Sequence, residues 1–202
     1  MGTQWIQIPR KFLEMDKGTK FLDVLVYAAI DFQKDSSNNT SRIGQRTIAD
    51  KYNIPLSKVE DAIKRLRESG YIDYRQLPSE KYKDCVFNEY TFPLIKDGKI
   101  EGGYLKLKPS LLIQSLPPKE RGILIYFQLI ALPDMNDIAE TKIEDIANRL
   151  KICRQTASKY LKKFLDIGQL HKSSSGHFYQ CQYLDKDIQA DNSKDSKLVM
   201  IC

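Results

Sequence analysis

One repeat within the chain limits its possible folds more than any other feature of the sequence. A shift of 98 positions lays residues 47–73 on residues 145–171 without a gap. Apolar positions match apolar positions throughout this alignment, as Ile48 does with Ile146. Because a repeated apolar pattern buries a repeated face, the two segments are expected to build the same core.

The match extends upstream of these segments with a slip of one residue. The apolar stretch 21–30 lies near 121–130, and the alternating pattern of WIQI (5–8) corresponds to that of YLKL (104–107). Such alternation is typical of a short strand. Two copies of one unit therefore account for nearly the whole chain. The expected organisation is a first domain at 1–95, a linker at 96–103, a second domain at 104–185 and a flexible tail at 186–202.

Both copies carry the same order of predicted elements. An apolar helix leads through a polar loop to a short helix, a tight turn and a longer helix that ends at Gly70 or Gly168. Glycine suits this position because a left-handed residue commonly terminates a helix. A hairpin of two strands follows each glycine. We expect apolar helices at 18–32 and 118–132, short helices at 45–52 and 142–150, and hairpin strands at 71–76 and 85–92 in the first copy and at 169–173 and 178–184 in the second.

This order of elements resembles the winged helix-turn-helix domain of DNA-binding proteins over nearly all of residues 3–185. The second copy contains ANRLKICRQTASKYLKKFLDIGQL, which is similar to bacterial transcription regulators in which a Ser/Arg-Gln-Thr segment opens the recognition helix. The first copy contains TIADKYNIPLSKVEDAIKRLRESGYI, which resembles the winged domains of plasmid and phage replication proteins, and the tandem layout resembles plasmid replication initiators. The resemblance implies an α+β, mainly helical fold with two winged helix-turn-helix domains in tandem.

The second copy supplies the residues most suited to reading DNA. In a helix-turn-helix, the N-terminal turn of the second helix meets base edges, where arginine pairs with guanine and glutamine with adenine. Contacts to phosphate further along position the protein without reading sequence. The predicted base-reading residues are Arg154, Gln155, Thr156 and Ser158, and the predicted backbone contacts are Lys159, Lys162, Lys163, Lys172 and His177. The alternative interpretation is a solvated basic face of an ordinary surface helix.

The corresponding helix of the first copy is less basic. Residues 57–69 hold four basic and three acidic side chains, whereas residues 154–166 hold four and one. Acidic side chains repel phosphates, so the second domain is expected to be the main DNA reader. Two roles stay open for the first domain, an auxiliary reader or a pairing surface for a homodimer. Its predicted secondary DNA contacts are Ser57, Lys58, Lys64, Lys81 and Lys83.

The composition agrees with a DNA-binding protein without requiring one. The 202 residues carry a formal net charge of +6, which is compatible with a polyanionic partner. No apolar run approaches the ~20 residues of a membrane helix, and the N-terminus lacks the apolar core of a secretory signal. The four cysteines lie too far apart for a metal clip or a redox pair. We therefore expect a reduced cytoplasmic protein with no membrane segment, metal or cofactor.

An enzymatic function is disfavoured, because the sequence shows no phosphate loop, nucleophile elbow or metal-ligand spacing and holds only two histidines. The expected function is sequence-specific binding of double-stranded DNA, as a replication initiator or transcription regulator of a plasmid, phage or other mobile element. A regulator would dimerise on an inverted repeat, whereas an initiator would bind clustered direct repeats. The alternative is a winged-helix protein-interaction module with weak, non-specific affinity for DNA.

Overall fold

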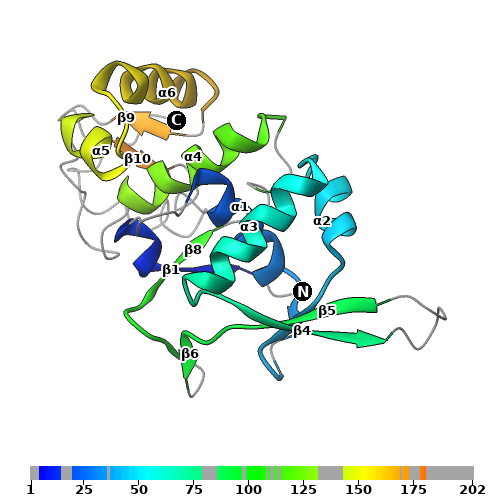
Figure 1. Cartoon of the computed structure of the whole chain (residues 1–202). Coiled ribbons are helices and arrows are strands. Elements are labelled where there is room, and N and C mark those ends of the chain that lie inside the picture. Colours follow the sequence, from blue (N-terminus) through cyan, green and yellow to red (C-terminus); the bar gives the residue numbers. More distant parts are fainter. Residues whose placement is uncertain are drawn as a thin grey trace, which may run out of the picture. The chain divides into compact units, whose positions relative to one another are not determined.

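The structure, a computed structural model, divides into two compact units, Met1–Tyr126 (unit 1) and Phe127–Cys202 (unit 2) (Figure 1). Helices and small antiparallel sheets make up a mixed α/β structure. Among the described residues, no helix is long and apolar enough to cross a membrane. The structure describes residues 5–14, 20–35, 37–78, 86–96, 99–107, 109, 112, 115–131, 143–168, 170–172 and 178–180.

Helix α1 (Phe21–Asp31) is buried in unit 1 along almost its whole length. A helix that is apolar on every side must be covered on every side. Here the covering elements are helices α2 (Gln45–Lys51) and α3 (Leu56–Glu68) and strand β1 (Ile6–Pro9). The one acidic residue near the start of α1, Asp23, is also buried, and its carboxylate accepts hydrogen bonds from Arg65 Nε (3.0 Å) and Nη2 (2.6 Å). This ion pair ties α1 to α3.

Helix α4 (Pro118–Ala131) begins in unit 1 and approaches other elements there very closely. The buried guanidinium of Arg121 donates hydrogen bonds to the backbone carbonyls of Tyr52 and Leu112. Tyr52 is the C-cap of α2, so this arginine holds the end of the short helix in place. A methyl group on Gly122 would lie 2.0 Å from the carbonyl oxygen of Phe21. Only glycine therefore permits this approach of α4 to α1.

Unit 1 contains a four-stranded antiparallel sheet in the order β2-β3-β5-β4. The hairpin expected after Gly70 is present as β4 (Asp73–Pro78) and β5 (Val86–Thr91). Strands β2 (Lys34–Asp35) and β3 (Thr40–Arg42) lie in a segment that the sequence predicts to be a polar loop, and that prediction is wrong. The polar residues form a tight hairpin turn instead: the Asp35 carboxylate accepts from Ser37 and the Asn38 side chain from Thr40.

The two short strands expected from WIQI and YLKL are present and pair with each other. Strand β1 is antiparallel to β8 (Tyr104–Leu107), with Ile6 opposite Leu107. A 3₁₀ helix, η1 (Arg10–Glu14), follows β1. The segment expected to be a linker contains the paired strands β6 (Ile95–Lys96) and β7 (Lys99–Ile100). Thus β8, which the repeat assigns to the second copy, completes a sheet inside unit 1.

Unit 2 consists of the end of α4, helices α5 (Ile143–Arg149) and α6 (Arg154–Asp166), and a hairpin of β9 (Leu170–Lys172) and β10 (Phe178–Gln180) (Figure 1). Both strands fall inside the ranges expected for the second hairpin. An aromatic cluster anchors α6: the Phe164 ring lies 5.4 Å from Phe127 edge-to-face and 6.0 Å from Tyr160 in a stacked arrangement. These contacts fix which face of α6 points outward.

The two helix pairs repeat each other residue by residue. Helices α5 and α6 begin and end 98 positions after α2 and α3. The residue after each short helix and its cap is left-handed, Asn53 at φ 49° and Lys151 at φ 52°. The same backbone hydrogen bond closes each turn. Ile54 N–H donates to the carbonyl of Ala49 (2.9 Å), and Ile152 N–H donates to the carbonyl of Ala147 (3.0 Å). The gapless sequence match therefore corresponds to one local geometry built twice.

Candidate nucleic-acid interface

Helix α6 separates its apolar and polar side chains onto opposite faces. Ala157, Leu161 and Phe164 are buried. The exposed side chains are Arg154, Gln155, Ser158, Lys159, Lys162 and, at the last position, Asp166. These include five of the nine residues of the second copy that are expected to contact DNA, so the structure gathers these five on one outward surface. We call this surface the α6 face.

The first turn of α6 begins at an exposed cysteine. Cys153 is the N-cap, and its carbonyl accepts the first helical hydrogen bond from Ala157 (3.0 Å). Its Sγ lies 3.0 Å from the Thr156 hydroxyl oxygen. Hydrogen bonding to Thr156, first through the side chain and then through the backbone, lowers the pKa of the Cys153 thiol below its usual value. Thr156, a predicted base-reading residue, is half-buried and hydrogen-bonded within its own turn.

Arg154 is held by an acidic residue that no sequence pattern indicates. Its Nε lies 2.9 Å from Glu144 Oε1 in the first turn of α5, and 71% and 51% of the two side chains are exposed. Exposed ion pairs are weak, about 0–1 kcal/mol, so a guanine edge or phosphate can displace this carboxylate. No local signal marked Glu144, because a short helix whose first turn carries acidic residues is ordinary.

The expected phosphate contacts are placed unequally. Lys159 and Lys162 are exposed on the α6 face, whereas Lys163 is half-buried and already interacts with another group. Lys172 belongs to strand β9. The remaining predicted wing contacts, Lys81, Lys83 and His177, lie outside the described residues.

Helix α3, the counterpart of α6 in unit 1, offsets its own positive charges. Ser57, Lys58 and Lys64 are exposed as expected. However, Lys58 Nζ lies 3.8 Å from Asp61 and Lys64 Nζ lies 4.0 Å from Glu68, all on α3. On α6 the only acidic residue, Asp166, is the last residue of the helix. A phosphate near α3 would therefore meet both signs of charge on the helix itself, whereas the carboxylate near the start of α6, that of Glu144, comes from α5 and is paired with Arg154.

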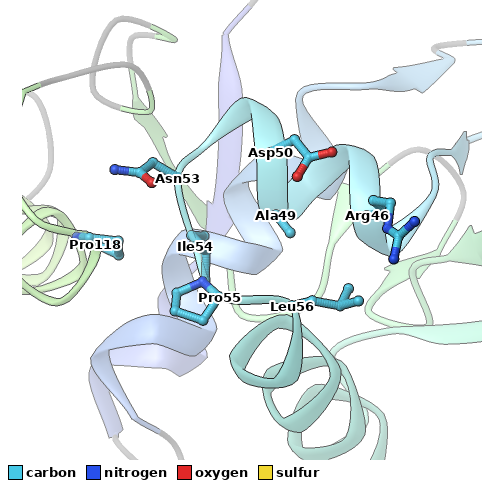
Figure 2. A pocket seen from close by; sticks show the side chains of 8 residues that line it. All are labelled: Arg46, Ala49, Asp50, Asn53, Ile54, Pro55, Leu56 and Pro118. Atoms are coloured by element: carbon cyan, nitrogen blue, oxygen red, sulfur yellow. The ribbon is translucent and has the colours of Figure 1, made fainter.

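A surface hollow of about 990 Å³ lies at the turn between α2 and α3 in unit 1. Figure 2 shows Arg46, Asp50 and Asn53 around its edge, with Pro55 and Leu56 at the start of α3. The hollow is wide open, and its lining mixes apolar groups with these few polar ones. It lacks the enclosed apolar walls that a small-molecule site needs. In the part of the chain that the structure describes, no group of three His, Cys, Asp or Glu side chains is arranged to hold a metal ion.

No protein-family model matches the sequence, and a comparison with curated proteins finds no significant relative. A functional assignment therefore comes from the residues and their geometry. The α6 face combines donors suited to base edges with neighbouring cations.

Proposed function

We propose that the protein binds double-stranded DNA in a sequence-specific manner, with α6 as its main reading helix. The observation that carries this proposal is the α6 face. Arg154 and Gln155 are exposed in its first turn, Lys159 and Lys162 follow on the exposed side, and the single acidic residue comes at the far end. Bidentate donors at the start and cations behind them are what reading a major groove from a helix N-terminus requires.

The local architecture of unit 2 supports this proposal. A short helix, a left-handed turn residue, a longer helix ending at a left-handed glycine and a two-stranded hairpin follow one another, as in a winged helix-turn-helix. Unit 1 contains the same series from α2 to β5. We therefore propose two winged helix-turn-helix domains in tandem. The short helix supports the longer one from behind and leaves its outer face available to a groove.

The difference in charge between α3 and α6 supports different roles for the two copies. Helix α3 offsets its lysines with acidic residues one turn away, so unit 1 is either an auxiliary reader or the pairing surface of a homodimer. A reader with two unequal domains suits a replication initiator or transcription regulator of a plasmid, phage or other mobile element. Clustered direct repeats in the bound DNA would favour the initiator, and an inverted repeat would favour a dimeric regulator.

A selection from sheared DNA of the source organism tests the proposal. We expect one locus to be enriched at moderate salt. On the enriched duplex, Arg154→Ala with Gln155→Ala should relax base preference, by roughly 1–3 kcal/mol for each bidentate pair of hydrogen bonds removed. Lys159→Ala with Lys162→Ala should weaken all duplexes similarly and reduce the slope of log K against log salt by about 2.

A matched control uses the lysine pair of the other copy. Lys58→Ala with Lys64→Ala removes the same charge from α3, where both lysines already face acidic residues, and should change affinity less. If no locus is enriched and binding is insensitive to base sequence, the proposal is wrong. The protein-interaction module with weak, non-specific DNA affinity then becomes the better explanation.

A further inference from the structure

Three charged residues form a row across the four-stranded sheet of unit 1. Glu89 on β5 lies directly opposite Arg42 on β3 and directly opposite Arg75 on β4. Residues that face each other across antiparallel strands project from the same side of the sheet. The row therefore has one carboxylate at its centre and one guanidinium on each side. We call it the Arg–Glu–Arg row.

Both guanidinium groups bind the central carboxylate side-on. Arg42 donates from Nε to Oε1 (2.8 Å), and its Nη2 forms an ion pair with the same oxygen (2.8 Å). Arg75 donates from Nε to Oε2 (2.7 Å), and its Nη2 forms an ion pair with that oxygen (2.6 Å). These hydrogen bonds lower the pKa of Glu89, so its carboxylate is charged at neutral pH. Only 5% of the Glu89 side chain is exposed, against 60% for Arg42 and 71% for Arg75. The acid is covered and the two bases face solvent.

The Arg–Glu–Arg row itself carries more positive than negative charge, and Arg42 also acts on the Asp35 carboxylate of the neighbouring strand β2. A single arginine would satisfy the charge of Glu89, and the second leaves the row with a net positive charge. Each guanidinium carries five N–H donors and turns its Nε and Nη2 groups toward the carboxylate. Among the described residues, no acceptor takes the Nη1 group of either arginine. Two oriented cations therefore present unused donors to solvent.

The chemistry of these donors fits phosphate oxygens. Guanidinium groups bind phosphates through several parallel N–H bonds, and a side chain that is already fixed loses less freedom when it binds. Both guanidinium groups converge on the carboxylate of Glu89, Arg42 on Oε1 and Arg75 on Oε2, so they lie side by side on one face of the sheet. A polyanion with closely spaced phosphates, such as a nucleic acid strand, can accept hydrogen bonds from both.

We propose that Arg42 and Arg75 contact the phosphate backbone of double-stranded DNA, and that Glu89 is the positioning residue that holds both guanidinium groups. The inference rests on the DNA-binding function proposed above and adds a contact surface in unit 1. It also gives the first copy a role as an auxiliary, sequence-independent binder, since phosphate contacts carry no base information.

The first test replaces both arginines and compares a matched pair of lysines. Arg42→Gln with Arg75→Gln should reduce the slope of log K against log salt by about 2, which corresponds to roughly a tenfold smaller affinity loss between 50 and 200 mM salt. Lys96→Gln with Lys99→Gln removes the same charge from exposed positions of the β6–β7 hairpin and should leave the slope nearly unchanged. Equal slopes for the two double variants would contradict the proposed contact.

The second test addresses the positioning role of Glu89. Glu89→Gln removes a negative charge, so if charge alone mattered it would tighten DNA binding. If Glu89 orients the two arginines, the same substitution weakens binding severalfold. Arg42→Lys with Arg75→Lys keeps both charges but loses the side-on fork, and should also weaken binding. Tighter binding by Glu89→Gln, or full affinity in the double lysine variant, would overturn the positioning role.

Two controls separate this inference from folding and from the main proposal. Circular dichroism and a thermal melt of each variant establish that the sheet is intact, and the double lysine variant retains a base on each side of Glu89 if the glutamine variants do not fold. If wild-type protein binds no duplex, both proposals fail. If the α6 variants lose binding while the arginine variants match the lysine control, only the role of the Arg–Glu–Arg row is wrong.

Discussion

The ion pair between Glu144 and Arg154 predicts that removing the Glu144 carboxylate will strengthen DNA binding. To reach a guanine edge, Arg154 must release the Glu144 carboxylate, which lies 2.9 Å from its Nε. Both side chains are more than half exposed, so breaking this pair costs about 0.2–1 kcal/mol. Glu144→Gln removes that cost, and we expect the affinity for the enriched duplex to rise about 1.4- to 5-fold.

Asp145→Asn is the matched control for this substitution. Asp145 is the next residue of α5, is exposed and carries the same charge. Fluorescence anisotropy of a labelled duplex at fixed salt gives the affinity of each variant, with and without Arg154→Ala. The gain from Glu144→Gln should exceed that from Asp145→Asn and should vanish when Arg154 is alanine. Weaker binding by Glu144→Gln alone would refute the reasoning, because Glu144 would then orient Arg154 instead of competing for it.

Three further predictions concern packing and reactivity. Gly122→Ala should lower the free energy of unfolding by about 1–3 kcal/mol in denaturant titrations, since its methyl would lie 2.0 Å from a backbone oxygen of α1. The control is Gly44→Ala, because the nearest atom to its added methyl is the Thr47 hydroxyl oxygen at 3.4 Å. Asp23→Asn should cost about 3 kcal/mol by leaving the Arg65 charge, four-fifths covered, without its partner. Because its pKa is lowered, Cys153 should alkylate at a lower pH than an ordinary thiol, and bound duplex should slow the reaction seen by peptide mass spectrometry.

The sequence predicts the helices of this protein better than its strand pairings. Apolar spacing is a local signal, so the bounds of α2 and α3, and of their copies α5 and α6, fall within a residue or two of expectation. The pairing of β1 with β8 joins residues about 100 positions apart, which no local pattern encodes. The sequence did not predict the β2–β3 hairpin, because the polar residues that close its tight turn are the same residue types that make up an open loop.

In the candidate site, too, local features were predictable from the sequence and long-range contacts were not. Helical periodicity alone predicts which residues share the α6 face, and the structure places Arg154, Gln155 and Lys159 together on it. The carboxylates that act on arginines were not predictable. Glu144 reaches Arg154 from a neighbouring helix, and Glu89 meets its two arginines only through strand register. Electrostatic partners depend on tertiary packing, which a single sequence does not display.

These two glutamates should act in opposite directions although each is paired with arginine. Glu144 is half exposed and pairs with an arginine that would have to leave it in the proposed complex, so we expect it to compete with DNA. Glu89 is covered and holds two guanidinium groups, so we expect it to orient them for the proposed phosphate contact. Glutamate-to-glutamine substitution removes one negative charge at either position. A model based on net charge predicts tighter binding in both cases, whereas the geometry predicts tighter binding at Glu144 and weaker binding at Glu89.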